Sequence, residues 1–198
     1  MSTSSVLSLR PEDVDRAGNL IARAFHEDPL NVHLYPDEAA RARLAPSMLA
    51  AFVRFDHLFG QVDHLPGFTA VASWSRPGTI ETAERMEQAG FDDLSHEQPL
   101  AALDAVFGHV GPSIAEVAPE PHWHLRLLAV DPSCQGRGLG AILLRHGLDR
   151  ATETGHSVVL ETFAERAVPF YRRNGLEIIV DAVEPVSGLR YWALRHMP

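Results

Sequence analysis

A glycine-rich turn in the second half of the chain places the tightest constraint on the fold. Residues 135–140 read Gln-Gly-Arg-Gly-Leu-Gly, between an apolar strand-like run (122–130) and a helix-like run (141–154). Because glycine has no Cβ, the backbone of such a turn can approach an anion closely. The free N–H groups at the start of the following helix then point at that anion with the positive end of the helix dipole. The turn therefore predicts a site for a phosphorylated cofactor.

Two kinds of cofactor are compatible with this turn. Gly136, Gly138 and Ala141 satisfy the fingerprint of dinucleotide-binding folds. Glu161 ends the next predicted strand, where an acid that binds ribose would lie. In those folds, however, the strand runs almost directly into the first glycine, whereas here Pro132 interrupts the ladder of strand hydrogen bonds before the turn. The chain after Glu161 is also too short to complete a doubly wound sheet, so the context disfavours a dinucleotide.

A second motif lies downstream at a separation typical of one enzyme family. Gln135, Gly138 and Gly140 fit the Gln/Arg-x-x-Gly-x-Gly/Ala pattern of motif A in the GNAT acetyltransferases. Residues 160–162 resemble the fifth strand of that family, and residues 168–176 resemble its fourth helix with the Phe-Tyr-x-x-x-Gly signature. The chain thus resembles the GNAT N-acetyltransferases, which bind acetyl-CoA.

The local sequence also resembles one branch of that family, the puromycin N-acetyltransferases. The matches are Phe-His-Glu-Asp-Pro at 25–29, Leu-Leu-Ala-Val-Asp-Pro at 127–132, and the Leu-Glu-Thr and Pro-Phe-Tyr triplets downstream. The resemblance implies the GNAT fold, which is a mixed α/β fold whose mostly antiparallel sheet splays at the cofactor strand. It also implies acetyl-CoA as the acetyl donor.

Composition favours one globular domain over residues 1–198. A chain of this length with 45% hydrophobic residues can bury a sufficient core without cross-links, and its single cysteine, Cys134, forms no intrachain disulfide. The first ten residues lack the basic and apolar regions of a signal peptide, and no apolar run is long enough to span a bilayer. We therefore expect a cytoplasmic protein that does not act at a membrane.

Apolar periodicity predicts the elements of the N-terminal half. Residues 6–10 favour a strand and residues 11–24 a helix. Residues 37–59 predict a second helix, interrupted at Pro46. Two alternating segments within 61–74 flank a Leu-Pro-Gly turn and predict a hairpin.

Residues 79–121 have helical periodicity and predict a helical insertion, broken near Gly90 and again at 108–112. Beyond the cofactor helix, residues 157–161 predict a strand and the helix around Tyr171 should end at Gly175. Two further strands, within 177–195, predict a closing hairpin.

The insertion is strongly acidic. Between residues 78 and 120 it has one arginine and nine acids: Glu81, Glu84, Glu87, Asp92, Asp93, Glu97, Asp104, Glu116 and Glu120. It therefore contributes most of the net charge of −9. Such a segment is either a solvated surface or a field that concentrates a cationic amine near a cleft. In both cases nucleic acid is a poor partner.

Acetyl transfer from a thioester to an amine requires a neutral amine, a stabilised oxyanion and a proton for the departing thiolate. In the GNAT family, backbone groups of the cofactor strand hold the pantetheine arm and face the thioester. The resemblance therefore assigns to cofactor binding the residues Leu128, Ala129, Val130, Gln135, Gly136, Arg137, Gly138, Leu139 and Gly140.

Tyr171 matches the usual general acid of the family. A phenol with an ordinary pKa of about 10 can deliver its proton to a thiolate whose conjugate acid has a pKa of roughly 8.5. The alternative is a core aromatic residue whose hydroxyl group is satisfied by a hydrogen bond. The Phe-Tyr-x-x-x-Gly context favours the catalytic role.

Two residues are candidates for the base that takes the amine proton. Glu161 ends its strand beside the expected cleft and can act as the base or as a substrate anchor, and His124 is the second candidate. His122 and His124 share one face of their strand, but no third ligand follows at a recognisable spacing, so we expect no metal. Cys134 adjoins the turn that holds the pyrophosphate, far from the acetyl end of the pantetheine, so we expect no covalent route through it.

These observations predict an enzyme that transfers acetyl from acetyl-CoA directly to the amine of a small molecule. Two alternatives stay open: an acetyltransferase that acts on a protein N-terminus or a hydroxyl group, and a CoA-binding sensor without turnover. Specificity would come from residues 25–35, the second helix and the acidic insertion, whose sequences do not name the acceptor. The sequence is equally silent on oligomeric state.

Overall fold

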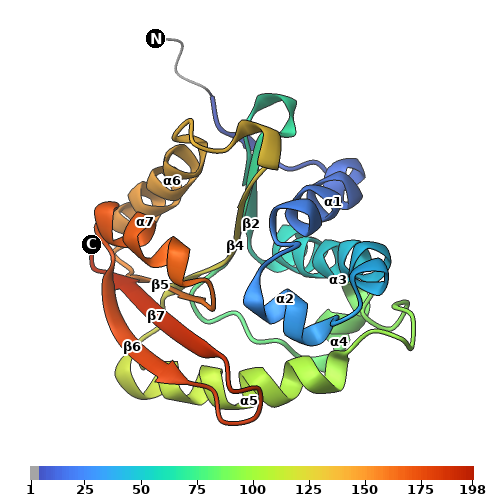
Figure 1. The fold of residues 1–198 in the computed structure, drawn as a ribbon. Helices are drawn as coiled ribbons and strands as arrows, with labels where there is room; N and C mark the ends of the chain where they lie inside the picture. Colours follow the sequence, from blue (N-terminus) through green and yellow to red (C-terminus); the bar gives the residue numbers. More distant parts are fainter. Residues whose placement is uncertain (1–4) are drawn as a thin grey trace.

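The computed structural model describes residues 5–198, and within them a seven-stranded sheet runs in the order β1-β2-β3-β4-β5-β7-β6 (Figure 1). The strands are β1 (Leu7–Ser8), β2 (Gln61–His64), β3 (Ala70–Ser75), β4 (Trp123–Val130), β5 (Val158–Thr162), β6 (Glu177–Val183) and β7 (Arg190–His196). Neighbouring strands are antiparallel except β4 and β5, which are parallel. The predicted mixed, mostly antiparallel sheet is confirmed, and it differs from the doubly wound sheet of dinucleotide-binding folds.

The helices are α1 (Val14–Ala24), α2 (Pro29–Leu34), α3 (Glu38–Phe59), α4 (Ala83–Gln88), α5 (Leu100–Val117), α6 (Leu139–Glu153) and α7 (Val168–Arg173). The short helix α2 was not predicted from periodicity. It begins because the Asp28 carboxylate accepts a hydrogen bond from the Leu30 N–H at 3.0 Å and Pro29 suits the first helical position. No helix in the described chain has both the length and the apolarity needed to cross a membrane.

Alternate residues of the strands face two separate helical layers. In β3, Val71 packs with α1 and α3, whereas Ala72 and Trp74 pack with α6. In β7, Ala193 faces α5 while Leu194 faces the α6 side. Because side chains of a strand alternate between faces, α1, α3 and α5 cover one side of the sheet, and α6 and α7 cover the other (Figure 1).

Two prolines lie inside helices that were predicted to break there. α3 continues through Pro46 and α5 continues through Pro112, so both predictions are wrong. A proline cannot donate a hydrogen bond to the carbonyl four residues earlier. Those carbonyls belong to Ala42 and Gly108, which are both exposed, so water can satisfy them. The predicted break near Gly90 is confirmed, because α4 ends just before this residue, which has φ of +80°.

Strands β4 and β5 part soon after they meet. They pair only at Trp123 with Val158 and at His124 with Val159, although β4 continues for six more residues. On the other edge of β4, the register against β3 shifts between Ser73 and Trp74, which leaves Arg126 as an extra residue in the ladder. Such a bulge bends the strand and redirects a side chain. The sheet is therefore splayed at β4, as predicted.

Candidate active site

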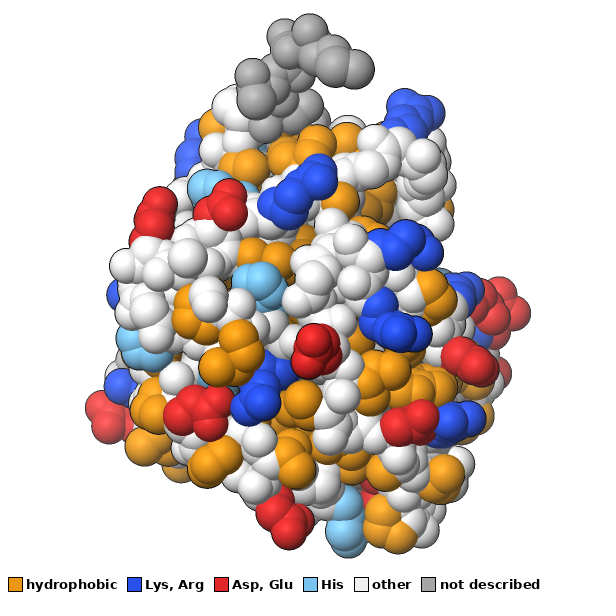
Figure 2. All heavy atoms as spheres, turned by 90° about the vertical axis from the view of Figure 1, so that its left-hand side faces the viewer, with side chains coloured by type: hydrophobic (Ala, Val, Ile, Leu, Met, Phe, Trp, Pro, Cys, Tyr) orange, Lys and Arg blue, Asp and Glu red, His pale blue; other side chains and the backbone are white. Residues whose placement is uncertain are grey.

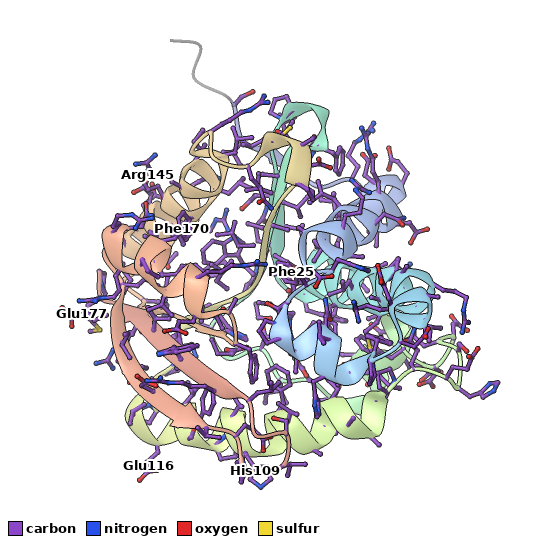
Figure 3. All side chains as sticks on the ribbon, viewed as in Figure 1. Phe25, His109, Glu116, Arg145, Phe170 and Glu177 are labelled. Carbon is purple, nitrogen blue, oxygen red and sulfur yellow. The ribbon has the colours of Figure 1, made fainter. Side chains whose placement is uncertain are left out.

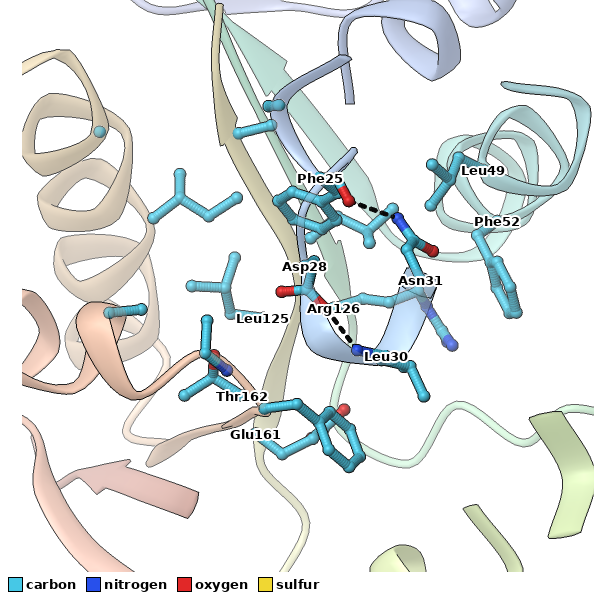
Figure 4. A pocket seen from close by; sticks show the side chains of 18 of the residues that line it. Phe25, Asp28, Leu30, Asn31, Leu49, Phe52, Leu125, Arg126, Glu161 and Thr162 are labelled. Carbon is cyan, nitrogen blue, oxygen red and sulfur yellow. Dashed lines mark hydrogen bonds between the residues drawn. The ribbon is translucent and has the colours of Figure 1, made fainter. Parts of the chain in front are cut away.

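A cavity of about 1050 Å³ opens where β4 and β5 part. Its walls come from β4, the glycine turn before α6, the end of β5, and α7 on one side. On the other side they come from α2, α3 and the helices of the insertion, α4 and α5. Figure 4 shows this space, with Leu125, Glu161 and Thr162 on the strand side and Leu30, Leu49 and Phe52 on the helical side.

The glycine turn presents backbone donors at one end of this cavity. Gly136 and Gly138 have φ of +75° and +76°, a conformation that strains any residue with a Cβ. Gly138 is the N-cap residue of α6, and in the described chain no side chain accepts a hydrogen bond from the first turn of this helix. The side chain of Gln135 donates to the Val130 carbonyl at 3.2 Å and so ties the turn to the end of β4. This geometry suits a phosphate group.

Most of the residues assigned to cofactor binding line the cavity: Leu128, Ala129, Val130, Gln135, Gly136, Gly138, Leu139 and Gly140. Arg137 is not among the lining residues. Its exposed guanidinium donates instead to the Ser133 carbonyl at 3.3 Å. Any contribution of the Arg137 side chain to the cofactor would therefore have to come from the outside of the turn.

His124 and Glu161 form an ion pair at the floor of the cavity. The Nε2 atom of His124 lies 2.8 Å from the Glu161 carboxylate. Burial alone would lower the pKa of His124, but the charge and hydrogen bond of Glu161 outweigh it and hold the pKa above its ordinary value. Burial would raise the pKa of Glu161, but His124 and then Arg126 bring it below its ordinary value. The two candidate bases are thus brought together as partners.

Tyr171 lines the same cavity from α7. Its ring packs edge-on against Phe170, with ring centres 5.1 Å apart. Burial raises the pKa of Tyr171, and the nearby charges of Asp28 and Glu161 raise it further. The phenol therefore keeps its proton throughout the neutral pH range.

A buried polar cluster under the cavity was missed by the sequence reasoning. The Arg126 guanidinium donates to Asp56 at 3.1 Å and to Ser75 at 2.8 Å, and it contacts Glu81 of the insertion at 2.6 Å. Asp56 is fully buried and also accepts hydrogen bonds from Ser73 and Ser75. The sequence feature that could have revealed this cluster is Arg126 within the mostly apolar strand β4, because a buried charge requires a partner.

Asp28 is a second site residue, which the sequence analysis did not single out although it lies within residues 25–35, the segment expected to contribute to specificity. It lines the cavity in front of the splayed strands (Figure 4), and its carboxylate caps α2. Burial raises the pKa of Asp28, against the opposing effects of the backbone N–H groups of Leu30 and Asn31 and of the Arg166 charge. The sequence feature that could have pointed to Asp28 is the Asp-Pro pair, which is typical of a helix start.

Two residues weighed from the sequence lie off the cavity. His122 is held at 2.8 Å from the Glu120 carbonyl, and burial lowers its pKa. Cys134 is partly exposed in the short turn after β4, and its Sγ lies 3.6 Å from the Ser133 hydroxyl. Within residues 5–198, no three His, Cys, Asp or Glu side chains are grouped so that they could hold a metal ion.

Comparison with known proteins identifies one family and several solved structures with a similar fold. Residues 67–176 match the profile of the acetyltransferase (GNAT) family. A solved structure from Corynebacterium glutamicum, described as histone acetyltransferase HPA2 and related acetyltransferase, superposes with a TM-score of 0.66 at 19% identity, over 98% of this chain and 96% of that one.

Two insect enzymes have the same fold. The polyamine N-acetyltransferase of Drosophila melanogaster, described as forming N-acetylagmatine, has a TM-score of 0.65 at 16% identity, over 98% of this chain and 99% of that one. Arylalkylamine N-acetyltransferase 2 from Aedes aegypti has a TM-score of 0.63 at 11% identity, over 98% of both chains. At these identities the likeness concerns the fold alone.

Proposed function

The chain belongs to the GNAT acetyltransferase family, and we propose that it transfers acetyl from acetyl-CoA directly to the amine of a small molecule. The observation that carries this proposal is the parting of β4 and β5 beside the glycine turn. It frees one edge of β4 next to a large cavity that also holds an acid and an ion-paired base. The resemblance to the puromycin N-acetyltransferase branch supports a small-molecule acceptor.

The residues present fit acetyl-CoA. The backbone N–H groups of residues 136–140 would bind the pyrophosphate. Gly136 and Gly138 have the left-handed backbone conformation, and no side chain caps the first N–H groups of α6, so these groups are free to bind an anion. The freed edge of β4 at Leu128, Ala129 and Val130 would receive the pantetheine arm. When bound, acetyl-CoA supplies an acetyl group activated as a thioester.

The side chains at the floor of the cavity supply the proton transfers. Tyr171 Oη donates a hydrogen bond, and then its proton, to the leaving sulfur. Neutral His124 donates its Nε2–H to the Glu161 carboxylate, so its Nδ1 is the atom free to take the proton of the amine, and Glu161 stabilises the resulting cation. These roles favour turnover over a sensor that only binds CoA, for which an ionisable pair in the cavity would serve no purpose.

Acetyl-CoA binding can be tested without knowing the acceptor. We expect acetyl-CoA to raise the melting temperature of the protein, because it binds the folded state. Gly138→Asp should weaken binding at least tenfold, since it adds bulk, strain and negative charge where the pyrophosphate would lie. Thermal shift titrations of both proteins measure this.

Gly155→Asp is the matched control for this experiment. Gly155 also has a positive φ, of +68°, and a Cβ there would meet nothing within 4 Å, but it follows the other end of α6. This variant should keep the full acetyl-CoA shift. Equal shifts in both variants, or a shift with NAD and none with acetyl-CoA, would overturn the cofactor assignment.

The pH dependence of turnover tests the proposed base. His124 must be neutral to accept a proton, so the rate should rise with pH through a midpoint above its ordinary pKa of about 6.5. Glu161→Gln removes the charge that holds the pKa of His124 up, so the midpoint should move to lower pH. A pH–rate profile of each variant checks this, with His124→Gln as the variant that should lose the rise. A midpoint that stays in place in Glu161→Gln would contradict the assignment.

A further inference from the structure

The acidic charge of the insertion faces largely away from the cavity. Of the nine acids between residues 78 and 120, Glu81 and Asp104 are the two that line it. Glu81 is already paired with Arg126 at 2.6 Å. Figure 3 shows Glu116 on the outer side of α5, pointing away from the interior. Figure 2 shows the side of the molecule that is on the left in Figure 1, and there acidic, basic and apolar side chains are interspersed.

What the insertion gives the cavity is an apolar wall. Five of its apolar residues line the space: Met86, Phe91, Leu100, Leu103 and Phe107. Leu30 from α2 and Phe52 from α3 extend this wall. In Figure 4 both lie on the side opposite β5, where an acceptor would approach the end of the freed strand. Burial against such a wall stabilises an apolar ligand in proportion to the area removed from water.

The charges that line the cavity are nearly balanced. Its acids are Asp28, Glu81, Asp104 and Glu161, and its basic side chains are His124, Arg126, Arg166 and Arg173. Glu81 and Glu161 each have a cation as a direct partner. A ligand with several positive charges would therefore meet three arginines beside the four acids, and a fourth cation whenever His124 is protonated.

Asp28 is the acid best placed for a single ammonium group. Its carboxylate is fixed by the Leu30 N–H at the start of α2 and lies close enough to Tyr171 for its charge to perturb the phenol. The charge of Arg166 acts on this carboxylate, but in the described chain no basic side chain lies within 4 Å of it as an ion-pair partner. An ammonium bound to it would lie near the proposed general acid.

From this arrangement we propose that the acceptor is a monoamine carried on a large apolar body, with its amine held by Asp28 and its body against the wall formed by α2, α3 and the insertion. This inference rests on the proposed function and deepens it. It selects an apolar amine over the guanidinium-bearing or polyamine substrates that a strongly acidic insertion would suggest.

Paired acceptors test the substrate class. In a thiol-release assay with acetyl-CoA, kcat/KM for 2-phenylethylamine should exceed that for agmatine at least tenfold. Both carry a primary amine, but agmatine has a second positive charge in place of the ring. Thiol release with agmatine as the better acceptor would overturn the inference and leave the proposed function standing. Thiol release with no amine at all, despite acetyl-CoA binding, would overturn both.

Variants locate the two parts of the site. Leu103→Asn on α5 should raise the KM for 2-phenylethylamine about tenfold, whereas Val117→Asn, an exposed residue at the end of the same helix, should not change it. Asp28→Asn keeps a side chain that can cap α2, so it should raise the KM of both amines about tenfold and preserve the acetyl-CoA thermal shift. An unchanged KM in Leu103→Asn or in Asp28→Asn would contradict the placement of the body or of the amine.

The acidic surface provides the opposing test. Glu116→Gln removes a charge that points outward, so the KM of either amine should stay the same. High ionic strength should also change the KM for 2-phenylethylamine less than twofold, because screening acts mainly on exposed charges. A KM that rises in Glu116→Gln and with salt would show that the field of the insertion selects the acceptor, and the inference would fail.

Discussion

Replacing Tyr171 by phenylalanine is expected to lower turnover about a hundredfold while acetyl-CoA affinity stays unchanged. This corresponds to about 2.7 kcal/mol of transition-state stabilisation. Burial and the charges of Asp28 and Glu161 raise the pKa of the phenol, so it always holds a proton to give. The raised pKa makes the transfer itself harder, so the hydroxyl contributes most as negative charge develops on the sulfur and its hydrogen bond strengthens.

Steady-state kinetics on a good acceptor, together with thermal shift titration of acetyl-CoA, separates these two effects. Tyr191→Phe is the matched control, because it removes a hydroxyl that is 2.6 Å from Ser113 of α5 and away from the cavity lining. It should leave turnover within about twofold. Turnover that is undiminished in Tyr171→Phe would make Tyr171 a core residue rather than the general acid.

Gly147→Ala is expected to destabilise the protein by about 3 kcal/mol. Gly147 lies in α6 against β3, and a Cβ there would overlap the indole ring of Trp74, which is fully buried. The better helix propensity of alanine returns only about 1 kcal/mol, whereas overpacking a core typically costs about 1–3 kcal/mol and occasionally more. A Cβ that overlaps a ring atom of Trp74 is a severe clash, for which we take a cost of about 4 kcal/mol. Because the ring is fully buried, we expect the clash to dominate.

Chemical denaturation measures this change, and the melting temperature should fall by roughly 6–12 °C for a chain of this size. Gly111→Ala is the control, since Gly111 is an exposed residue in α5 where a Cβ would meet nothing within 4 Å. That variant should be unchanged or up to about 1 kcal/mol more stable. If Gly147→Ala proved as stable as Gly111→Ala, the close approach of α6 to β3 would be wrong.

Several features followed from the sequence because they depend on residues close together in the chain. The glycine turn, the helix after it and the cap at Gly175 are local, and Gly138 and Gly175 indeed have positive φ. The hairpin of β2 and β3 follows from alternation on either side of a turn signal. The splay of the sheet was predicted instead from the resemblance to the GNAT family, since no local sequence pattern indicates where two parallel strands part.

The continuation of α3 through Pro46 and of α5 through Pro112 could not be predicted from local sequence. A proline removes one hydrogen bond, but whether the helix breaks depends on where the orphaned carbonyl points and on what holds the neighbouring turns. Both carbonyls belong to exposed residues, and α3 packs along α1 and the sheet. Exposure and packing are tertiary properties, so the local rule failed at both positions.

The sequence by itself thus determined the glycine turn, the order of most elements and the identity of Tyr171, Glu161 and His124 as candidates. Only the tertiary structure decided that His124 and Glu161, 37 residues apart, form one ion pair, and that Arg126 is held by Asp56 from 70 residues away. It also decided that the acidic insertion turns its apolar residues to the cavity and most of its charge to solvent. The reason is physical. Backbone conformation depends largely on the neighbouring residues in the sequence, whereas the direction and partners of a side chain depend on which distant segments pack against it.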